Sequence, residues 1–465
     1  MQTTTSPAAL SIPHVRAAVR GRVIAPDDSD YDAARTVVTG GIDRHPAVIV
    51  RVADDDDVAA VICLARDNGL ELAVRSGGHS GPGFGVTEGG IVLDLRDMKA
   101  LDIDAEQRTA WAETGLTAAE YTKAAAEHGL ATGFGDTGSV GIGGLTLGGG
   151  VGYLVRRDGL TIDQLLAADI VTADGEKLRV DADSHPDLFW AIRGGGGNFG
   201  VATRFKLRLH DVSSYVGGML LLPATADSVA GFIAAADAAP DELSTIANVM
   251  PVPPMPFVPE EHHGKLAILA LIGYAGDVEA GQRALAPFRA LGTPYADMLR
   301  PMAYPEMYPP DAEDYHPLAI AKTMFIDRVD RAVGETIMRH LEASDAAMRV
   351  AQLRVLGGAM ARVPAEATAF AHRASKIMVN VASFYEGPDD MPQRQRWVDD
   401  FVADLRQDDD GAYVNFLAEE GEAGVRAAYP DATLNRLAAV KAKYDPTNLF
   451  RLNQNIPPAA VGSGG

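Results

Sequence analysis

A single histidine stands in a glycine turn, Arg75-Ser76-Gly77-Gly78-His79-Ser80, directly after an expected strand. Three further glycine clusters follow, at 141–144, 148–150 and 194–197. Glycine tolerates positive φ and lets backbone N–H groups approach a ligand closely. Several such turns in one half of a chain indicate a large, phosphate-bearing cofactor that is held mainly by the backbone.

None of these turns matches a nucleotide motif by itself. The cluster 194–197 follows an expected helix rather than a strand, so it lacks the context of the dinucleotide fingerprint. No Walker lysine stands after any of the glycine loops. The turn at 76–80, taken alone, is equally compatible with a small structural turn before a strand. A nicotinamide or nucleoside-triphosphate site is therefore disfavoured.

The elements that must position these turns alternate between strands and helices. Runs of β-branched residues and strict apolar–polar alternation predict strands, and apolar residues at helical spacing behind acidic or Thr caps predict helices. The expected strands cover 47–52, 71–75, 91–95, 165–172, 177–180 and 201–209, and the expected helices begin at 54–57, at the capping box 117–120 and at Ser184. The histidine turn then lies at the end of the strand 71–75.

The character of the chain changes after Val212. The glycine clusters stop, and longer helices with prolines at their joints follow. Strands expected over 353–356 and 376–383 belong to a second sheet. We therefore expect one domain over 1–212, a second over 213–411, and a C-terminal segment over 412–465 that returns to short motifs.

Length and composition are those of an ordinary globular protein of two or three domains, with 465 residues, 47% hydrophobic and 22% charged. The net charge of −22 argues against nucleic acid and anionic membranes, because both require clustered Lys and Arg. The single cysteine excludes an intrachain disulfide. The N-terminus has neither a basic nor an apolar signal region, and no stretch could span a bilayer, so we expect a cytoplasmic location. The oligomeric state stays open.

The adjacent residues His262 and His263 are the most obvious candidates for metal ligands. On a strand, neighbouring side chains point to opposite faces, so the two make a poor metal pair. An exposed loop is the better interpretation, and we expect no metal site.

Five segments carry a resemblance together that none of them carries alone. They are, in order, 75–80, 143–150, 156–160, 187–203 and 444–450. Together they resemble the berberine-bridge-enzyme-like branch of the FAD-linked oxidases, over about residues 40–457. The resemblance implies the vanillyl-alcohol-oxidase or PCMH-type fold, which is α+β. A FAD-binding domain of two α/β subdomains then meets a substrate domain with an antiparallel sheet covered by helices, and the C-terminal segment returns to the FAD-binding domain.

The resemblance also implies how FAD is held. His79 matches the histidine that bonds covalently to the flavin 8α-methyl group, a bond that raises the reduction potential of the flavin. The turn around it would hold the pyrophosphate, and the later glycine clusters and C-terminal asparagines would hold the rest. The implied cofactor-binding residues are Arg75, Ser76, Gly77, Gly78, His79, Ser80, Gly143, Gly144, Thr146, Gly200, Val201, Asn453 and Asn455.

Two positions beside Ser139 bear on the flavin attachment and on oxygen. Doubly linked relatives carry a cysteine four residues before the glycine that is Gly141 here, and this chain has Thr137 in that place. A hydroxyl cannot form the cysteinyl bond, so we expect one link, through His79. Val140 falls at the family's oxygen gatekeeper, where a small or β-branched side chain leaves room for dioxygen. This predicts an oxidase that makes hydrogen peroxide; simple packing of a valine is the alternative.

The candidate catalytic residues follow from the same resemblance. Tyr413 and Asn415 lie where the family has a Tyr-x-Asn strand facing the flavin, so Tyr413 is our candidate base for the substrate's hydroxyl or amine proton. Tyr153 resembles an aromatic residue of the pocket wall. Gln352 and Arg354 share a strand of the substrate domain, and we expect the face of Gln352 to meet the pocket. Ordinary sheet packing is the alternative for each of them.

Val379 and Val381 are also expected to face the pocket, where plant relatives tend to carry Lys and Gln. Their apolar character predicts a less polar substrate than a sugar. We therefore expect an FAD-dependent oxidase of a small alcohol, amine or related carbon–hydrogen donor, with hydride transfer to flavin N5 and reoxidation by O₂. The alternatives are a dehydrogenase of the same fold with another electron acceptor, and a flavin-binding protein without turnover.

Overall fold

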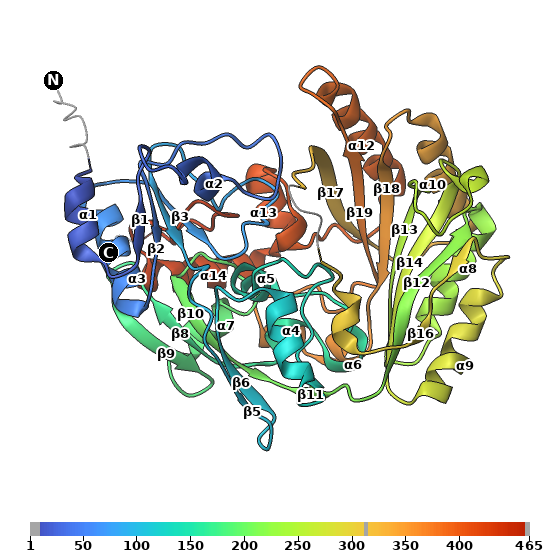
Figure 1. Cartoon of the computed structure of the whole chain (residues 1–465), viewed down its shortest axis with the longest axis horizontal. Coiled ribbons are helices and arrows are strands. Elements are labelled where there is room, and N and C mark those ends of the chain that lie inside the picture. The colour runs from blue at the N-terminus through green and yellow to red at the C-terminus, as the bar shows by residue number, and fades with distance from the viewer. Residues whose placement is uncertain (1–9, 311–314, 461–465) are drawn as a thin grey trace.

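A computed structural model describes residues 10–310 and 315–460 of the chain. Two bodies lie side by side in Figure 1. One holds the N-terminal strands and short helices together with the last helices of the chain. The other is a large sheet whose outer face is covered by helices.

The first sheet is mixed and has the strand order β1-β2-β4-β3. Strand β4 pairs in parallel with both β2 and β3, and β1 pairs with β2 antiparallel. The carboxylate of Asp54 accepts hydrogen bonds from the N–H groups of Asp56 and Asp57, so the expected acidic cap is confirmed. The elements of this region are α1 (Ile12–Ala18), β1 (Arg22–Ile24), α2 (Tyr31–Arg35), β2 (Val48–Arg51), α3 (Asp55–Asp67), β3 (Leu72–Arg75) and β4 (Ile91–Asp94).

The second sheet is antiparallel, with the strand order β5-β6-β10-β8-β9. Its strands and the small pair β7–β11 are β5 (Leu101–Asp104), β6 (Thr109–Glu113), β7 (Leu130–Ala131), β8 (Leu165–Val171), β9 (Lys177–Asp181), β10 (Val201–Arg208) and β11 (His210–Asp211). Its helices are α4 (Ala118–Ala126), α5 (Ile142–Gly148), α6 (Val155–Asp158), η1 (Thr161–Asp163) and α7 (Pro186–Ala191). The capping box of Thr117 and Glu120 is confirmed. Helix α7 is shorter than expected and has no side-chain cap, because His185 before it is left-handed.

The third sheet has the order β15-β12-β14-β13-β18-β19-β17, and β16 also pairs with β12. Its strands are β12 (Tyr215–Pro223), β13 (Leu243–Pro251), β14 (Leu266–Ala275), β15 (Ala296–Asp297), β16 (Arg300–Pro301), β17 (Ala319–Ile326), β18 (Arg349–Val355) and β19 (Ile377–Phe384). All of its pairings are antiparallel, and the two strands expected from the sequence, β18 and β19, are neighbours. Its helices are α8 (Ala226–Asp237), η2 (Glu260–His262), α9 (Val278–Arg289), η3 (Tyr304–Met307), α10 (Arg331–Ala343), α11 (Ala359–Arg362), η4 (Ala365–Ala367) and α12 (Met391–Leu405).

Helices α8, α9, α10 and α12 cover the outer face of this sheet (Figure 1). The inner face is turned toward the first body. The antiparallel, helix-covered sheet beside an α/β body gives the α+β architecture that the resemblance implied.

The last helices, drawn in red in Figure 1, return to the first body. They are η5 (Val414–Phe416), α13 (Gly421–Ala428) and α14 (Asp431–Tyr444). The ammonium of Lys441 on α14 is fully buried and donates to the carboxylate of Asp445 at 2.6 Å, to the carbonyl of Asn198 at 2.7 Å and to that of Phe450 at 2.9 Å. This buried Lys441 contact set joins the glycine loop before Asn198 to the C-terminal segment.

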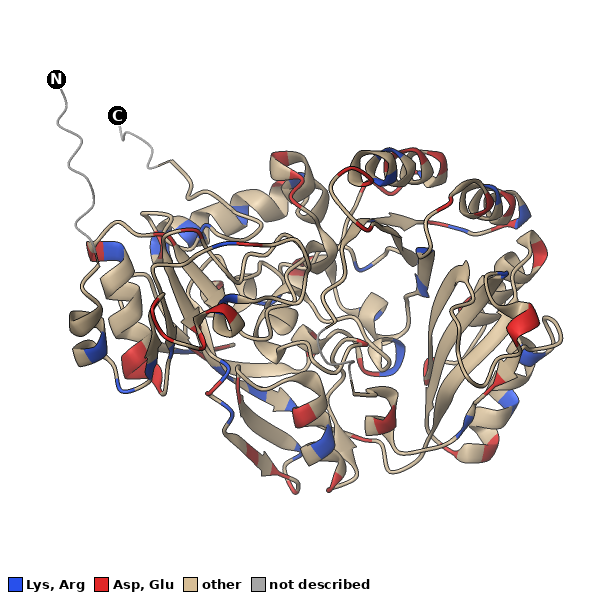
Figure 2. Ribbon diagram, turned by 45° about the horizontal axis from the view of Figure 1, so that its top comes forward, with Lys and Arg blue, Asp and Glu red and all other residues tan. Residues whose placement is uncertain are grey.

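Charged residues of both signs are spread over the helices and loops of both bodies (Figure 2). Within the described ranges, no helix has both the length and the apolar character needed to cross a membrane.

Candidate active site

A cavity of about 1090 Å³ runs between the two bodies. Its walls combine the histidine turn, the loop and helix around α5, the glycine loop before β10, the inner face of β17, β18 and β19, and the C-terminal segment. Ligand pockets typically measure about 300–1,000 Å³, so this one can hold a cofactor and a small substrate together.

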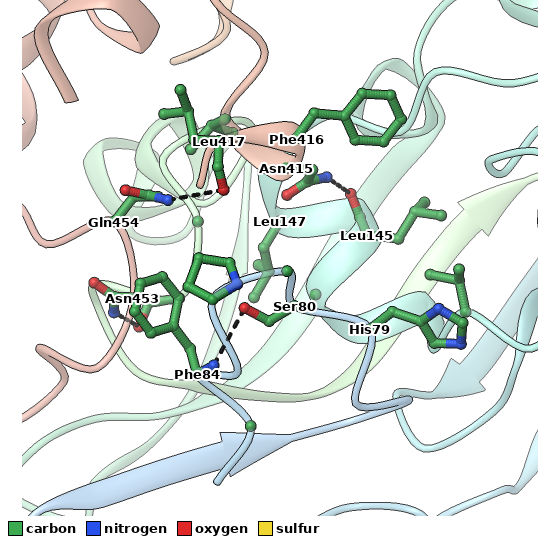
Figure 3. A pocket seen from close by; sticks show the side chains of 18 of the residues that line it. His79, Ser80, Phe84, Leu145, Leu147, Asn415, Phe416, Leu417, Asn453 and Gln454 are labelled. Carbon is green, nitrogen blue, oxygen red and sulfur yellow. Dashed lines mark hydrogen bonds between the residues drawn. The ribbon is translucent and has the colours of Figure 1, made fainter. Parts of the chain in front are cut away.

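The histidine turn projects into this cavity from the end of β3 (Figure 3). Its shape is fixed by bonds outside the cavity, since the carbonyl of Gly78 accepts from Val38 and the hydroxyl of Ser76 donates to the carbonyl of Thr114. The Nε2 atom of His79 shares a hydrogen bond of 2.9 Å with the hydroxyl of Ser139. The imidazole is thereby oriented by the loop that leads into α5.

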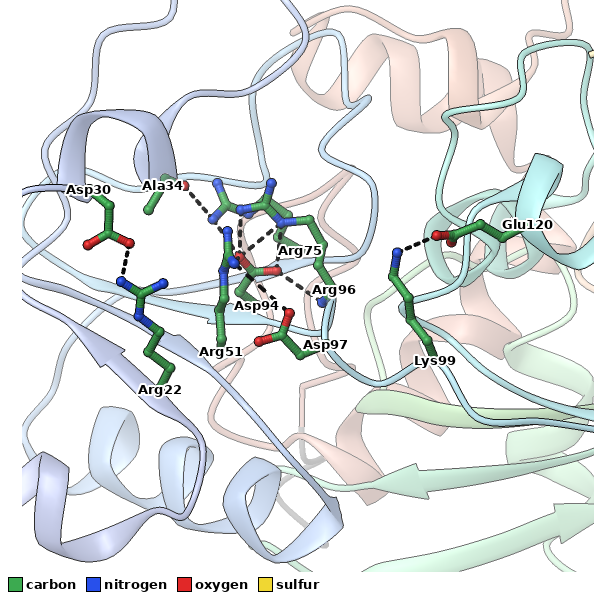
Figure 4. Close-up of polar contacts among 10 residues, drawn as sticks. All are labelled: Arg22, Asp30, Ala34, Arg51, Arg75, Asp94, Arg96, Asp97, Lys99 and Glu120. Atoms are coloured by element: carbon green, nitrogen blue, oxygen red, sulfur yellow. Dashed lines mark hydrogen bonds and ion pairs between the residues drawn. The ribbon is translucent and has the colours of Figure 1, made fainter. Parts of the chain in front are cut away.

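Arg75 holds the base of the turn. Its guanidinium donates to the carbonyl of Ala34 at 2.6 Å and to the carboxylate of Asp94 at 2.8 Å (Figure 4). Asp94 is fully buried and also pairs with Arg96 at 2.8 Å. Burial alone would raise the pKa of Asp94, but Arg75 and Arg96 hold it below its ordinary value. Arg75 also lines the cavity, so it fixes the turn and stays a predicted cofactor-binding residue.

Helix α5 packs directly on the histidine turn. A Cβ on Gly77 would lie 2.3 Å from the backbone nitrogen of Gly141, so only glycine permits this contact. Farther along the wall, a Cβ on Gly81, Gly144 or Gly197 would meet nothing within 4 Å. These three glycines line the cavity and leave their Cβ positions open for a ligand.

The far end of the cavity is closed by the C-terminal segment. Asn453 lines it and donates to the carbonyls of Gly197 at 3.3 Å and Phe450 at 3.1 Å. Its Oδ1 atom is buried and has no partner among the described residues. Gly200 and Val201, also predicted to bind the cofactor, line the same cavity. An orphaned buried acceptor calls for a donor from a bound molecule.

Three expected site residues do not line the cavity. Thr146 is fully buried inside α5, and Asn455 lies beyond the last lining residue, Gln454. Tyr153 packs edge-on against Tyr308 with 5.8 Å between the ring centroids, and its hydroxyl donates to the carbonyl of Asp136 at 3.4 Å. Burial, followed by the charge of Asp136, raises the pKa of Tyr153 well above its ordinary value. The expectation that Tyr153 is an aromatic of the pocket wall is therefore wrong.

The substrate-side wall carries a chain of polar contacts. The amide of Gln352 donates to Oδ1 of Asn248 at 2.9 Å, and its oxygen accepts from Arg354 at 2.7 Å. Arg354 also donates to Oδ2 of Asp136 at 2.6 Å. Gln352 lines the cavity as expected, but both ends of its carboxamide are engaged by protein. It therefore holds Arg354 in place.

The register of β19 overturns one expectation. Asn380 pairs with Gln352, so it lies on the inner face, while Val379 and Val381 pair with Leu353 and Ala351 on the other face. Both valines are fully buried under the outer helices. The prediction that they face the pocket is wrong, and with it the basis for an apolar substrate. Asn380 lines the cavity instead, and its Oδ1 is buried without a partner among the described residues.

Tyr413 and Asn415 come together at the cavity, although not on the expected strand. Val414 begins a short 3-10 turn, η5. The Asn415 amide donates to Oη of Tyr413 at 2.9 Å and to the carbonyl of Leu145 at 3.0 Å, the second contact being visible in Figure 3. The N–H of Gly150 donates to the same Oη at 2.8 Å. Burial raises the pKa of Tyr413, and Gly150, Asn415 and Arg354 oppose that rise.

Thr137 and Val140 both line the cavity, on the loop that carries Ser139. The hydroxyl of Thr137 lies 3.5 Å from the carboxylate of Asp136. The backbone of Val140 is pinned, because its carbonyl accepts from Ala118 at 2.9 Å, and its side chain is half-buried. A β-branched side chain is thus held in a fixed place in the wall.

Sequence reasoning missed several residues of the cavity. Asp136, Asn380, Phe84 and Gln454 all line it. Asp136 stands one residue before Thr137, which was singled out, so its carboxylate next to a glycine loop was a usable signal. Asn380 could have been found from the pattern only if the register of β19 were known. In the described part of the chain, no three His, Cys, Asp or Glu residues gather as a metal site.

The cavity fits FAD. It is long enough to join the histidine turn to the C-terminal segment, it is lined by open glycine positions, and it offers the unpartnered acceptor of Asn453. Backbone-lined glycine walls accept phosphate groups, and a polar inner sheet leaves room for a substrate. Fold and site together define a flavin-dependent oxidoreductase.

Comparisons with known proteins identify the family. Residues 46–181 match the model of an FAD binding domain, and residues 412–457 match that of berberine and berberine-like proteins. The chain is 32% identical over 455 residues to (R)-6-hydroxynicotine oxidase of Paenarthrobacter nicotinovorans, covering 95% of this chain and 97% of that protein.

Solved structures agree. The crystal structure of 6-hydroxy-D-nicotine oxidase from Arthrobacter nicotinovorans superimposes with a TM-score of 0.82 at 29% identity, over 94% of this chain and 98% of that one. BBE-like 1 of Physcomitrella patens has a TM-score of 0.86 at 22% identity, over 96% and 99% of the two chains, and shows the same fold. The chain belongs to the berberine-bridge-enzyme-like family of FAD-linked oxidoreductases, and the expected α+β, PCMH-type fold is confirmed.

Proposed function

We propose that this enzyme carries FAD on His79 alone, oxidises a small polar alcohol or amine with Tyr413 as base, and returns its electrons to O₂. The observation that carries the proposal is that one cavity is lined by His79, Val140 and Tyr413. When bound, FAD supplies the hydride acceptor, its N5 atom.

The chain's own residues would hold the cofactor from both ends. The turn Ser76 to Ser80 and the glycines of α5 offer backbone at one end, and Asn453 offers an orphaned acceptor at the other. Ser139 orients the imidazole of His79 for a bond to the flavin. Thr137 stands in the cavity where doubly linked relatives have cysteine, which supports a single link.

Tyr413 would accept the proton of the substrate. Tyr413 lines the cavity, and its phenolic oxygen accepts hydrogen bonds from Gly150 and Asn415, so it is fixed before a substrate arrives. A base held in place lowers the entropic cost of proton transfer. Burial excludes water from the ring, since Tyr413 is 3% exposed.

The proposed substrate class follows from the cavity wall that β18 and β19 form. Gln352, Asn380 and Arg354 make this wall polar, and the charge of Arg354 is balanced by Asp136. A neutral wall with amide groups suits a substrate with hydroxyl or amine groups rather than a purely apolar or anionic one. The relative that oxidises (R)-6-hydroxynicotine supports an amine among the candidates.

The proposal that O₂ reoxidises the flavin depends on Val140 in the cavity wall. A dehydrogenase of the same fold is the second candidate, because a half-buried valine in this wall need not admit O₂. Both candidates share the reductive step and differ only in reoxidation.

The experiment is a two-step measurement on the flavin. The holoenzyme is mixed anaerobically with a panel of primary amines, secondary amines, alcohols and sugars, and bleaching of the flavin absorbance is recorded. The reduced enzyme is then mixed with air-saturated buffer. Reoxidation much faster than that of free reduced flavin, with release of H₂O₂, is expected; slow reoxidation would point to the dehydrogenase, and no bleaching by any donor would refute turnover.

A further inference from the structure

The glycine run 148–150 has a role other than holding a cofactor. It does not line the cavity, although its neighbours Leu147 and Val151 do. A Cβ on Gly148 would lie 2.0 Å from Oδ1 of Asn415, and one on Gly149 would lie 3.1 Å from the ring of Tyr413. Gly149 has φ of 139° and Gly150 has φ of 81°, which side-chain-bearing residues rarely adopt. The run therefore makes room for Tyr413 and Asn415.

Two N–H donors converge on the phenolic oxygen of Tyr413. The backbone N–H of Gly150 donates at 2.8 Å, and Nδ2 of Asn415 donates at 2.9 Å. Because Nδ2 also lies 3.0 Å from the carbonyl oxygen of Leu145, which can only accept, the orientation of the amide is fixed. Both hydrogens of Nδ2 are thus used. The oxygen of Tyr413 accepts two hydrogen bonds, and its own proton can enter neither of them.

An oxygen that accepts two N–H bonds is stabilised more as an anion than as a neutral hydroxyl. Arg354 is the charged group that acts on Tyr413 from β18, and it also favours the anion, although Asp136 balances part of its charge. Tyr429, which follows α13, is a further titratable neighbour of Tyr413. Burial works in the opposite direction and raises the pKa of Tyr413. The two donors oppose part of the rise that burial causes in the pKa of Tyr413.

We propose that the N–H of Gly150 and the amide of Asn415 form a two-donor seat that stabilises the phenolate form of Tyr413 and so eases its ionisation, with Asn415 as a positioning residue. The inference rests on the proposed role of Tyr413 as base. In the step it serves, the O–H or N–H bond of the substrate breaks and the proton bonds to Oη. The electron pair stays on the substrate's heteroatom.

The test is a pH titration of Tyr413 in the holoenzyme. The protein carries tyrosine labelled with carbon-13 at Cζ, and NMR records the Tyr413 resonance at each pH. The Tyr413 resonance is assigned by its loss in Tyr413→Phe. Removing one donor with Asn415→Leu should raise the titration midpoint of Tyr413 by about 1 pH unit or more. Asn415→Asp keeps the size but replaces the donor with a carboxylate, and it should raise the midpoint further. Asn380→Leu changes another amide of the cavity and should leave the midpoint where it is.

Two results would overturn the proposal. In the first, Asn415→Leu and Asn415→Asp have the same titration midpoint of Tyr413 as the wild type. In the second, Tyr413 of the wild type stays protonated up to the pH at which the protein unfolds. The size-matched Asn415→Asp keeps the comparison available if Asn415→Leu does not fold. The titration needs no substrate, so it is independent of the bleaching panel, whose failure would refute the proposed turnover instead.

Discussion

Arg354 on β18 and Asp136, in the loop before α5, form an ion pair in the cavity wall with 2.6 Å between Nη2 and Oδ2. The arginine side chain is 4% exposed and the aspartate 22%. This pair is a direct side-chain link between the third sheet and the first body.

Breaking this pair should destabilise the protein strongly. In Arg354→Met, Asp136 keeps its charge but loses its partner in a partly buried place, and such losses cost about 3 kcal/mol. The free energy of unfolding from urea titration measures it. Arg362→Met, which removes an exposed arginine paired with Asp241 on the same body, is the matched control and should cost less than about 1 kcal/mol. Equal losses in the two variants would contradict the link.

His79→Ala should free the flavin while the fold persists. The turn that carries the imidazole is fixed by other groups, since the hydroxyl of Ser76 donates to Thr114 and the carbonyl of Gly78 accepts from Val38. After acid precipitation, the wild type should keep its yellow colour in the pellet and His79→Ala should lose it to the supernatant. Mass spectrometry of the flavin peptide locates the link. A flavin peptide without residue 79, or wild-type flavin freed by acid, would refute single attachment at this residue.

The rate of flavin reduction should rise with pH. A base acts as its deprotonated form, and burial raises the pKa of Tyr413 above its ordinary value of 10.0. Below that pKa the phenolate fraction grows tenfold per pH unit, so the logarithm of the reduction rate should rise with a slope of about 1. Stopped-flow bleaching under anaerobic conditions measures it.

Tyr413→Phe is the companion to this pH profile. It should lower the reduction rate by about 10²- to 10⁴-fold and flatten the slope. A variant that keeps the wild-type slope would assign the proton to another group.

Lys441→Met should loosen the far end of the cavity. It leaves the fully buried carboxylate of Asp445 without its partner, which costs about 3–5 kcal/mol. It also releases the carbonyls of Asn198 and Phe450. Lys443→Met, two residues along the same helix and exposed, is the control. Urea unfolding should separate the two variants, and a Lys441→Met protein as stable as Lys443→Met would contradict the role of the buried contact set.

Much of the fold could be predicted because its signals are local. The capping box at Thr117 and the acidic cap at Asp54 involve residues three positions apart, and the alternation in β10 reads directly from its sequence. His79 and the glycine turns around 77–78, 141–144 and 196–197 were expected to share a site, and they line one cavity. These inferences needed no knowledge of how distant segments meet.

The errors came from long-range geometry. A shift of one residue in β19 moves Val379 out of the cavity and Asn380 into it, and the sequence of the strand is apolar enough to permit either. The glycines at 148–150 look like a phosphate loop until Tyr413 and Asn415, far along the chain, are placed beside them. In both cases, contacts between segments far apart in the sequence determine which residues face the cavity.

The buried Lys441 contact set has a consequence for biosynthesis. The histidine turn is translated about 370 residues before Phe450 to Gln454, which line the same cavity. A nascent chain therefore has no complete flavin chamber at any length short of these residues. Closure of the cavity around a flavin must therefore wait until residue 454 has been translated.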